Sequence, residues 1–146
     1  MTIRKNIELR DATNEDANAI ANLLTELGYP TDAAAIPGRI ATVLAQGGAV
    51  LLAVPPDGPP LGLMSLDRHF ALHATDPIAY ITALVASPTA RRHGVGRALV
   101  AAAKQWAIEQ GCARISVTSA EHRADAHAFY PACGLPYTGK RFSTSL

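Results

Sequence analysis

A basic loop that contains two glycines carries the clearest chemical signal in this 146-residue chain. The loop reads Arg91-Arg-His-Gly-Val-Gly-Arg97, so Arg91, Arg92, His93 and Arg97 place positive or potentially positive charge around the glycines. Glycine has no Cβ, so the backbone can turn tightly there and approach a ligand closely. The alternative interpretation, a solvated surface loop, is disfavoured because the glycines coincide with the charges.

An amphipathic helix is expected to begin inside this loop. From Val95 onward, apolar residues recur on one helical face, and Gly111 is well placed to end the helix. The amides of residues 94–97 would then form a helix N-terminus, where unpaired N–H groups and the positive end of the helix dipole bind phosphate. A Walker loop is absent, and the dinucleotide fingerprint fails because Leu99 occupies its third glycine position.

The spacing Arg91-x-x-Gly94-x-Gly96 resembles the pyrophosphate-binding signature Gln/Arg-x-x-Gly-x-Gly/Ala of the GCN5-related N-acetyltransferase (GNAT) superfamily, which binds acetyl-CoA. The strand-like run before the loop and the helix after it agree with that superfamily as well. The resemblance implies that backbone groups of Leu84 and Val85 pair with the pantetheine arm like a short added strand, while their side chains pack in the core. It implies the following cofactor-binding residues: Leu84, Val85, Arg91, Arg92, His93, Gly94, Val95, Gly96 and Arg97.

A second stretch, residues 123–135, resembles the superfamily's other signature, in which Phe-Tyr is followed four residues later by Gly-Phe. The resemblance implies that Tyr130 protonates the departing CoA thiolate, and a phenol with a pKa of about 10 is protonated at neutral pH and acidic enough to donate. The alternative is a tyrosine packed at a helix end. Three departures bear on this role: Pro131 disfavours helical geometry at Tyr130, Leu135 replaces phenylalanine, and Arg123 stands near the usual place of a cofactor-contacting asparagine.

The sequence identifies no clear general base. Some superfamily members carry a glutamate at the start of the strand before the phosphate loop, where this chain has Tyr80. Four residues are candidates by approximate position only, and each is also readable as a solvated polar residue: Asp67, His69, His73 and Glu121. The histidine spacings match no metal-binding motif, so no metal site is expected. A serine hydrolase is unsupported because Gly-x-Ser-x-Gly does not occur.

The elements that must position these residues alternate between strands and helices. The patterns predict strands near residues 7–11, 49–54, 61–70, 78–85, 114–118 and 137–146. They predict helices near residues 17–27, 32–46, 95–111 and 123–133, the second of which is expected to bend or break at Pro37-Gly38. Thr13 and Asp16 form a capping-box-like start for the first helix. A mixed α/β sheet with helices on both faces accommodates this order.

The composition indicates one folded, soluble domain over residues 1–146, with 49% hydrophobic and 17% charged residues. The net charge of +1 argues against a general affinity for nucleic acid or for an anionic membrane. Cys112 and Cys133 form no Cys-x-x-Cys motif, which favours reduced residues of a cytoplasmic protein. The chain shows no signal segment and no run of the ~18 apolar residues that a transmembrane helix requires.

Together these features resemble a single-domain GNAT-like (acyl-CoA N-acyltransferase) α/β fold, a mixed and mostly antiparallel sheet flanked by helices on both faces. The resemblance implies an N-acetyltransferase in which a primary amine attacks acetyl-CoA directly, without a covalent enzyme intermediate. One alternative is a non-catalytic acyl-CoA sensor of the same fold, and another is a small nucleotide-binding regulator. The acceptor stays open among small amines, antibiotics, amino acids and protein N-termini, and a homodimer is left open as well.

Overall fold

A central sheet of five strands organises the computed structural model, which describes residues 7–90, 94–118 and 124–146. The strands lie in the order β1-β2-β3-β4-β5 across the sheet. Their bounds are Glu8–Asp11 (β1), Ala49–Val54 (β2), Gly62–His69 (β3), Ile78–Ala86 (β4) and Arg114–Val117 (β5). The first three neighbouring pairs are antiparallel and the β4–β5 pair is parallel, which confirms the predicted mixed, mostly antiparallel sheet.

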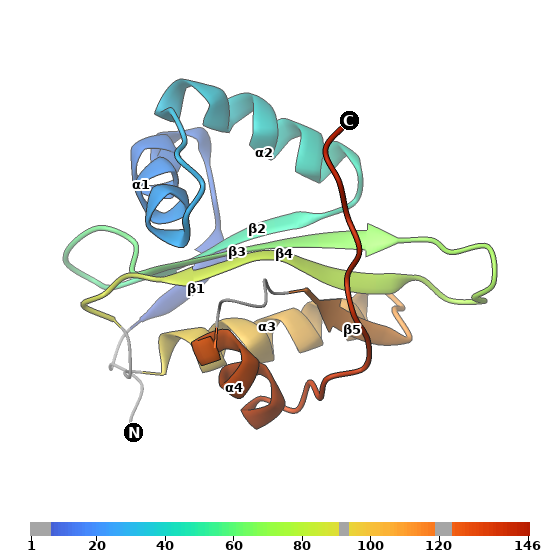
Figure 1. Cartoon of the computed structure of the whole chain (residues 1–146). Helices are drawn as coiled ribbons and strands as arrows, with labels where there is room; N and C mark the ends of the chain where they lie inside the picture. The colour runs from blue at the N-terminus through green and yellow to red at the C-terminus, as the bar shows by residue number, and fades with distance from the viewer. Residues whose placement is uncertain (1–6, 91–93, 119–123) are drawn as a thin grey trace.

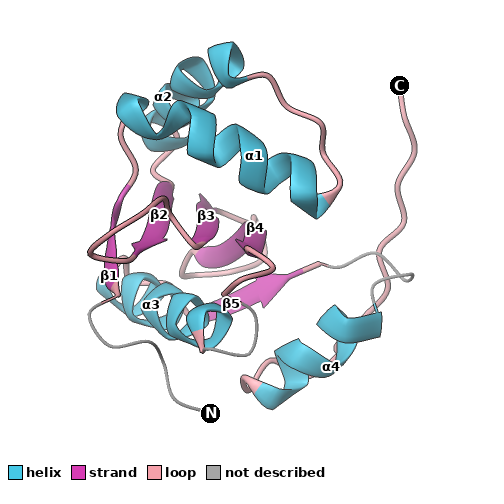
Figure 2. Ribbon diagram, turned by 90° about the vertical axis from the view of Figure 1, so that its left-hand side faces the viewer, coloured by secondary structure: helices cyan, strands magenta, loops and turns pink. Residues whose placement is uncertain are grey.

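Helices cover both faces of this sheet, as predicted (Figure 1, Figure 2). On one face lie α1 (Ala17–Leu27) and α2 (Ile36–Ala45), each preceded by a short 3-10 turn, η1 (Asn14–Asp16) or η2 (Ala33–Ala35). On the other side lie α3 (Val95–Glu109) and α4 (Ala124–Ala132). Within the described ranges, no helix is both long and apolar enough to cross a membrane.

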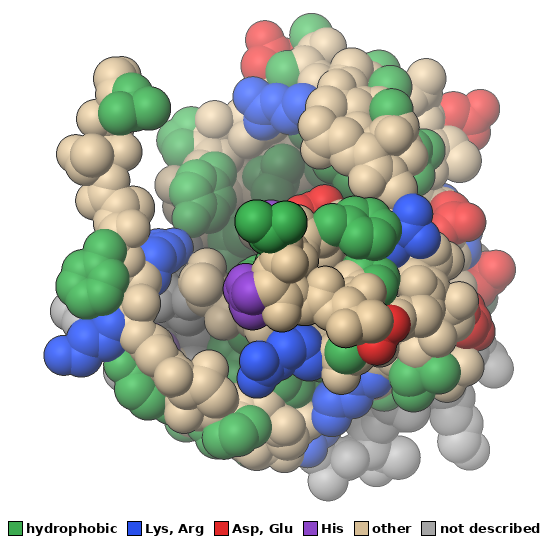
Figure 3. All heavy atoms as spheres, turned by 90° about the vertical axis from the view of Figure 1, so that its right-hand side faces the viewer, with side chains coloured by type: hydrophobic (Ala, Val, Ile, Leu, Met, Phe, Trp, Pro, Cys, Tyr) green, Lys and Arg blue, Asp and Glu red, His purple; other side chains and the backbone are tan. Residues whose placement is uncertain are grey.

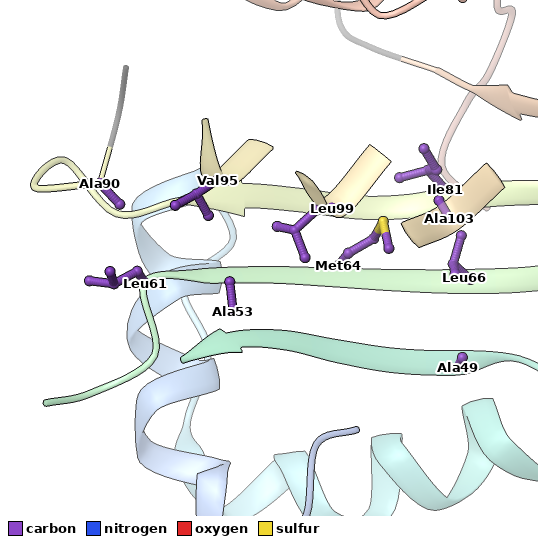
Figure 4. Packing of buried hydrophobic residues seen from close by; sticks show 10 residues of the cluster. All are labelled: Ala49, Ala53, Leu61, Met64, Leu66, Ile81, Ala90, Val95, Leu99 and Ala103. Atoms are coloured by element: carbon purple, nitrogen blue, oxygen red, sulfur yellow. The ribbon is translucent and has the colours of Figure 1, made fainter. Parts of the chain in front are cut away.

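The connection from β4 to β5 runs through α3, whose apolar face packs on the sheet. Val95, Leu99 and Ala103 recur every four residues, so they share one helical face, and each is 1% exposed or less. Figure 4 shows them facing Met64 and Ile81 of the sheet. A second buried cluster joins α1 and α2 to the opposite face and includes Ile20, Ile36, Ile40, Val50, Leu52, Leu63 and Val85. The first cluster fixes α3 on the sheet, and the second fixes α1 and α2 on the opposite face.

A β-bulge interrupts the regular alternation of β4. The pairing with β3 shifts between Ser65 and Leu66, which leaves Thr82 as an extra residue in β4. Ile81 packs in the cluster beneath α3, whereas Val85, four residues later, packs in the cluster beneath α1 and α2. Residues four apart in a regular strand point to the same face, so the bulge explains the change of face and also bends the strand.

The bend predicted at Pro37-Gly38 is wrong. α2 begins at Ile36, so Pro37 lies in its first turn and the helix continues through Gly38. A proline in the first turn removes an N–H that has no intrahelical partner, and its fixed φ suits a helix start. The interruption instead falls before the proline, where η2 gives way to α2.

The strand predicted for residues 137–146 is also wrong, because these residues form neither helix nor strand. Figure 2 shows the C-terminal segment standing away from the sheet, and Figure 3 shows a hollow between it and the rest of the molecule. Tyr137, Phe142 and Leu146 are largely exposed. A strand is stabilised only when it pairs with a neighbour, and the local sequence could not reveal that this segment stays unpaired.

Candidate active site

The N-terminus of α3 lies where the sequence predicts it. Gly94 caps the helix with φ +80°, a left-handed conformation that glycine adopts without steric cost. The next residue, Val95, is buried, and a Cβ added to Gly62 of β3 would lie 2.7 Å from its side chain. Glycine at position 62 therefore lets the start of α3 press closely onto the sheet.

The first turn of α3 is able to bind an anion. The Ala98 N–H donates to the Gly94 carbonyl at 3.0 Å, and the amides before Ala98 have no carbonyl one turn back in the helix. No acidic side chain lies in this first turn. The geometry fits a pyrophosphate at the described members of the predicted loop, Gly94, Val95, Gly96 and Arg97. The other three predicted loop residues, Arg91, Arg92 and His93, lie outside the described residues.

Helix α4 packs against this first turn. A Cβ added to Gly96 would lie 3.1 Å from the Phe129 ring, so the absence of a side chain there makes room for the aromatic ring. The Arg97 guanidinium donates to the Ala132 carbonyl at 3.4 Å, and the Lys104 ammonium donates to the Cys133 carbonyl at 2.6 Å. Cations at the C-terminal end of a helix complement its dipole. The anion-binding turn and α4 therefore form one structural unit.

Tyr130 is a half-buried residue of α4. The centroids of its ring and of the Phe129 ring lie 5.3 Å apart, in an edge-to-face arrangement. The expectation that Pro131 disfavours helical geometry at Tyr130 is wrong, since both residues lie within α4. The proline falls in the last turn, where the one hydrogen bond it removes costs little because the helix ends directly after it. Gly134, with φ +88°, follows as the C-terminal stop.

Among the described residues, none pairs with the edge of β4 that faces β5 toward the C-terminal end of β4; we call this edge the uncovered edge. The pairing with β5 ends at Ile81 and Val117, whereas β4 continues to Ala86. Leu84 and Val85, the predicted partners of the pantetheine arm, lie in this extension. On their other side, both residues pair with β3. In the described part of the chain, the backbone groups on this edge are therefore left for an extended ligand to pair with, and the extension leads toward the first turn of α3.

A cavity of about 160 Å³ lies between α1 and α2, above the bulge of β4. Its walls are formed by Ile20, Leu24, Ile36, Arg39, Ile40, Val43, Val50, Leu63, Ser65 and Ala83. All but Arg39 and Ser65 are apolar. A larger cavity of about 570 Å³ lies near the C-terminal half of α3, lined in part by Gln105 and Trp106. Only the smaller cavity touches the bulged part of β4.

A strip of polar side chains continues from this cavity along β3 and β4. The Ser65 and Thr82 hydroxyls are hydrogen-bonded to each other. Asp67 stands opposite Tyr80 in the β3–β4 register. The His69 and Tyr80 rings meet edge to face, with their centroids 5.5 Å apart. Residues two apart on β3 share a face, so Ser65, Asp67 and His69 all lie on the α1–α2 face.

The structure separates the four general-base candidates. Asp67 and His69 lie in the polar strip on the same face as the small cavity, whereas His73 lies in the exposed loop after β3. Glu121 lies outside the described residues. In the described part of the chain, no group of three or more His, Cys, Asp or Glu side chains could hold a metal ion.

Two features of the site were missed by reasoning from the sequence. One is Phe129, whose contact with Gly96 ties α4 to the anion-binding turn and has no local sequence signal. The other is the bulge at Thr82. It has no local sequence signal either, because Ile81 and Val85 fit the regular two-residue alternation of a strand, and only their packing on opposite faces reveals the extra residue.

Comparisons with known proteins agree with this geometry. The family model described as "Acetyltransferase (GNAT) family" matches residues 13–135. An aminoglycoside N(6')-acetyltransferase type 1 of Stenotrophomonas maltophilia is 34% identical over 134 residues, which cover 89% of this chain and 86% of that protein. An aminoalkylphosphonate N-acetyltransferase of Salmonella typhimurium is 31% identical over 140 residues, which cover 95% of this chain and 91% of the relative.

The fold is shared with solved acetyltransferases. An aminoglycoside N-acetyltransferase solved in complex with CoA superposes with a TM-score of 0.84 at 17% identity, over 100% of this chain and 99% of that one. That likeness shows the fold alone. The family match and the two sequence relatives show which family the chain belongs to. The chain belongs to the acetyltransferase (GNAT) family and is an N-acetyltransferase that uses acetyl-CoA as its acetyl donor.

Proposed function

We propose that this N-acetyltransferase holds the diphosphate of acetyl-CoA on the first turn of α3 and the pantetheine arm along the uncovered edge of β4, and transfers the acetyl group directly to a small primary amine. One observation carries the proposal. The extension of β4 beyond Ile81 leads toward the helix N-terminus at Gly94, so one extended ligand can reach both. Residues 82–86 span about 16 Å at ~3.3 Å per residue, a length that suits the pantetheine arm.

The acceptor amine reaches the thioester from the α1–α2 face. α3 and α4 occupy the other side of the sheet, and the small cavity touches the bulge at the inner end of the uncovered edge. Holding an amine beside the thioester carbonyl makes the attack effectively intramolecular. The amine nitrogen forms a bond to the carbonyl carbon, and the carbon–sulfur bond then breaks to release the CoA thiolate.

Two proton transfers accompany this step. Tyr130 donates its hydroxyl proton to the departing thiolate, and its place in α4, which packs on the anion-binding turn, supports that role. The polar strip receives the proton of the amine, directly or through water, with Asp67 and His69 as the candidate acceptors. A neutral amine is required because a protonated amine has no lone pair for the attack.

The acceptor is a small molecule with a primary amine, as the named substrates of the two relatives indicate for those proteins. A homodimer and a cytoplasmic location also belong to the proposal. Light scattering tests the first, and cell fractionation tests the second.

Calorimetry with CoA, together with a thiol-release assay over a panel of amines, tests the proposed function. We expect CoA to bind and free thiol to appear in proportion to acetylated amine. Binding of CoA without acetylation of any amine would favour the acyl-CoA sensor of the same fold. Failure to bind CoA at all would contradict the proposed diphosphate site on the first turn of α3, and with it the proposed function.

A further inference from the structure

The guanidinium of Arg39 is the one charged group in the wall of the small cavity. We infer that the acceptor is a small amine that also carries an anionic group, a carboxylate or a phosphonate, and that Arg39 binds this anion at the rim of the cavity. The inference rests on the proposed function and names the substrate class for the same site. The size of the cavity, its charge and its position support it.

The size of the cavity favours a small acceptor body. Pockets that enclose drug-sized ligands measure about 300–1,000 Å³, whereas an apolar cavity of about 150 Å³ holds one benzene molecule. The cavity above the bulge has about 160 Å³. It therefore has room for a group of roughly six non-hydrogen atoms, such as a short aliphatic chain, and for only part of a molecule built from several sugar rings.

The charge of the cavity points the same way. None of the lining residues is acidic, so a polycationic acceptor would find a guanidinium and no carboxylate on these walls. Arg39 is exposed on α2. The one ion pair among the described residues joins Arg10 to Asp16, so no carboxylate in that part of the chain occupies the Arg39 guanidinium. A guanidinium binds carboxylate or phosphonate oxygens in a two-pronged, charge-assisted contact.

The position of the cavity assigns the two ends of the acceptor. Ser65 and Ala83 line it at the bulge of β4, and the Ser65 hydroxyl is bonded to that of Thr82. The amine belongs at this end, since the uncovered edge of β4 begins here. Arg39 on α2 belongs to the opposite wall. An amine with an aliphatic body and an anion can thus place all three parts on groups of matching chemistry.

A series of amines with one carbon skeleton tests this inference. 5-Aminopentanoate and 4-aminobutylphosphonate carry the anion at the end opposite the amine, 5-aminopentanamide replaces the anion with a neutral amide, and pentylamine has neither; kanamycin represents polycationic aminosugars. We expect kcat/KM for the two anionic amines to exceed that for 5-aminopentanamide by about tenfold, the worth of one exposed but bidentate contact. The comparison of 5-aminopentanoate with the phosphonate distinguishes the two sources of the anion.

Matched variants assign the preference to one side chain. Arg39→Met keeps the aliphatic stem and should reduce the ratio of kcat/KM for 5-aminopentanoate over 5-aminopentanamide to near one, mainly through KM. Arg39→Lys should retain part of the ratio. Arg114→Met is the control. It removes an exposed arginine at the start of β5, opposite Ile78 of β4, and should leave the ratio unchanged.

The outcomes separate this inference from the proposed function. Acetylation of 5-aminopentanamide, pentylamine or kanamycin as efficiently as of 5-aminopentanoate would overturn the inference while acetyl transfer stands. If no amine is acetylated, the proposed function fails, and calorimetry with 5-aminopentanoate and 4-aminobutylphosphonate in the presence of CoA tests the anion site by itself. Binding that Arg39→Met weakens about tenfold would support the anion site, and no binding would overturn it.

Discussion

At the scale of single residues, the chemistry depends on groups that the fold brings together from distant parts of the chain. Tyr130 belongs to α4, on one side of the sheet. Asp67 and His69 belong to β3, and they lie on the opposite face of the sheet, the face covered by α1 and α2. The proposed acid and the proposed proton acceptors thus approach the thioester from different sides. This separation suits a reaction in which one proton is taken from the amine and another is given to the thiolate.

Replacing Tyr130 with phenylalanine tests the acid. Tyr130→Phe keeps the ring against Phe129 and removes only the hydroxyl, so kcat should fall about 10²-fold if that hydroxyl protonates the thiolate. The KM for acetyl-CoA should stay close to that of the wild type. Tyr137→Phe, which alters a largely exposed tyrosine outside the helix, serves as the control. Undiminished kcat in Tyr130→Phe would remove the assignment.

Replacing Asp67 with asparagine tests the proton acceptor. Asp67→Asn should lower kcat/KM about tenfold at neutral pH, where the amine is protonated and a base is needed. The deficit should shrink as the pH approaches the amine's own pKa of about 10, because the free amine then forms without help. A pH profile of kcat/KM measures this. Asp76→Asn, in the exposed loop before β4, should match the wild type, and a pH-independent deficit in Asp67→Asn would contradict the role.

At the scale of elements, the contact between α3 and α4 couples cofactor binding to the placement of Tyr130. The two helices meet where Gly96 leaves room for the Phe129 ring, and the Arg97 and Lys104 side chains reach carbonyls at the end of α4. α4 has only nine residues, too few for a stable helix in isolation. Its position therefore depends on this contact.

A methyl group on Gly96 tests the coupling. In Gly96→Ala the new Cβ lies 3.1 Å from the Phe129 ring, so the ring must move, and overpacking of this kind costs about 1 kcal/mol or more. We expect a lower melting temperature, weaker CoA binding and a lower kcat. Adding Phe129→Leu should restore much of the stability. Gly38→Ala, where a Cβ meets nothing within 4 Å in α2, should instead stabilise the fold by about 0.5–1 kcal/mol.

The start of α1 is held by an ion pair that also caps the preceding turn. Asp16 accepts two hydrogen bonds from the Arg10 guanidinium, each at 2.9 Å, and one from the Thr13 N–H at 2.8 Å. The hydrogen bonds from Arg10 are the main cause that holds the pKa of Asp16 below its usual value, against the opposing effect of burial. This arrangement is the capping-box-like start predicted from Thr13 and Asp16.

Asp16→Asn should lower the free energy of unfolding by about 1 kcal/mol at pH 7. Because the folded-state pKa of Asp16 is lowered, the wild type's advantage is fully present above the ordinary aspartate pKa of about 3.9 and disappears as the pH falls through the folded value. Urea unfolding of both proteins at pH 7 and in acid measures this. A difference that persists at low pH would mean that the carboxylate charge is not its source.

At the scale of the whole molecule, the sheet is open at one end and the chain leaves a segment unpaired. β4 and β5 part beyond Ile81, and residues 135–146 form neither helix nor strand. The exposed side chains of Tyr137, Phe142 and Leu146 lie along that segment. Exposed apolar side chains that cluster along one segment favour association.

The proposed homodimer is tested on this segment. If Phe142 is buried between two copies, light scattering should give twice the mass of the chain for the wild type and a smaller mass for Phe142→Ser. The replacement should leave the melting temperature of the monomer nearly unchanged, because the side chain is 89% exposed. Leu72→Ser, at an exposed position in the loop after β3, is the matched control. A monomeric wild type at micromolar concentration would contradict the dimer.

The sequence by itself determined most elements and the place where α3 begins. The apolar period from Val95, the glycines at 94 and 96 and the Thr13–Asp16 start all act between neighbours, because the hydrogen bonds of a helix close within four residues. Only the tertiary structure decided where β4 separates from β5, that Phe129 fills the space beside Gly96, that Arg39 faces a small apolar cavity, and that the last segment stays unpaired. These features depend on contacts between residues far apart in the chain, and no local pattern records which strand or side chain will be the partner.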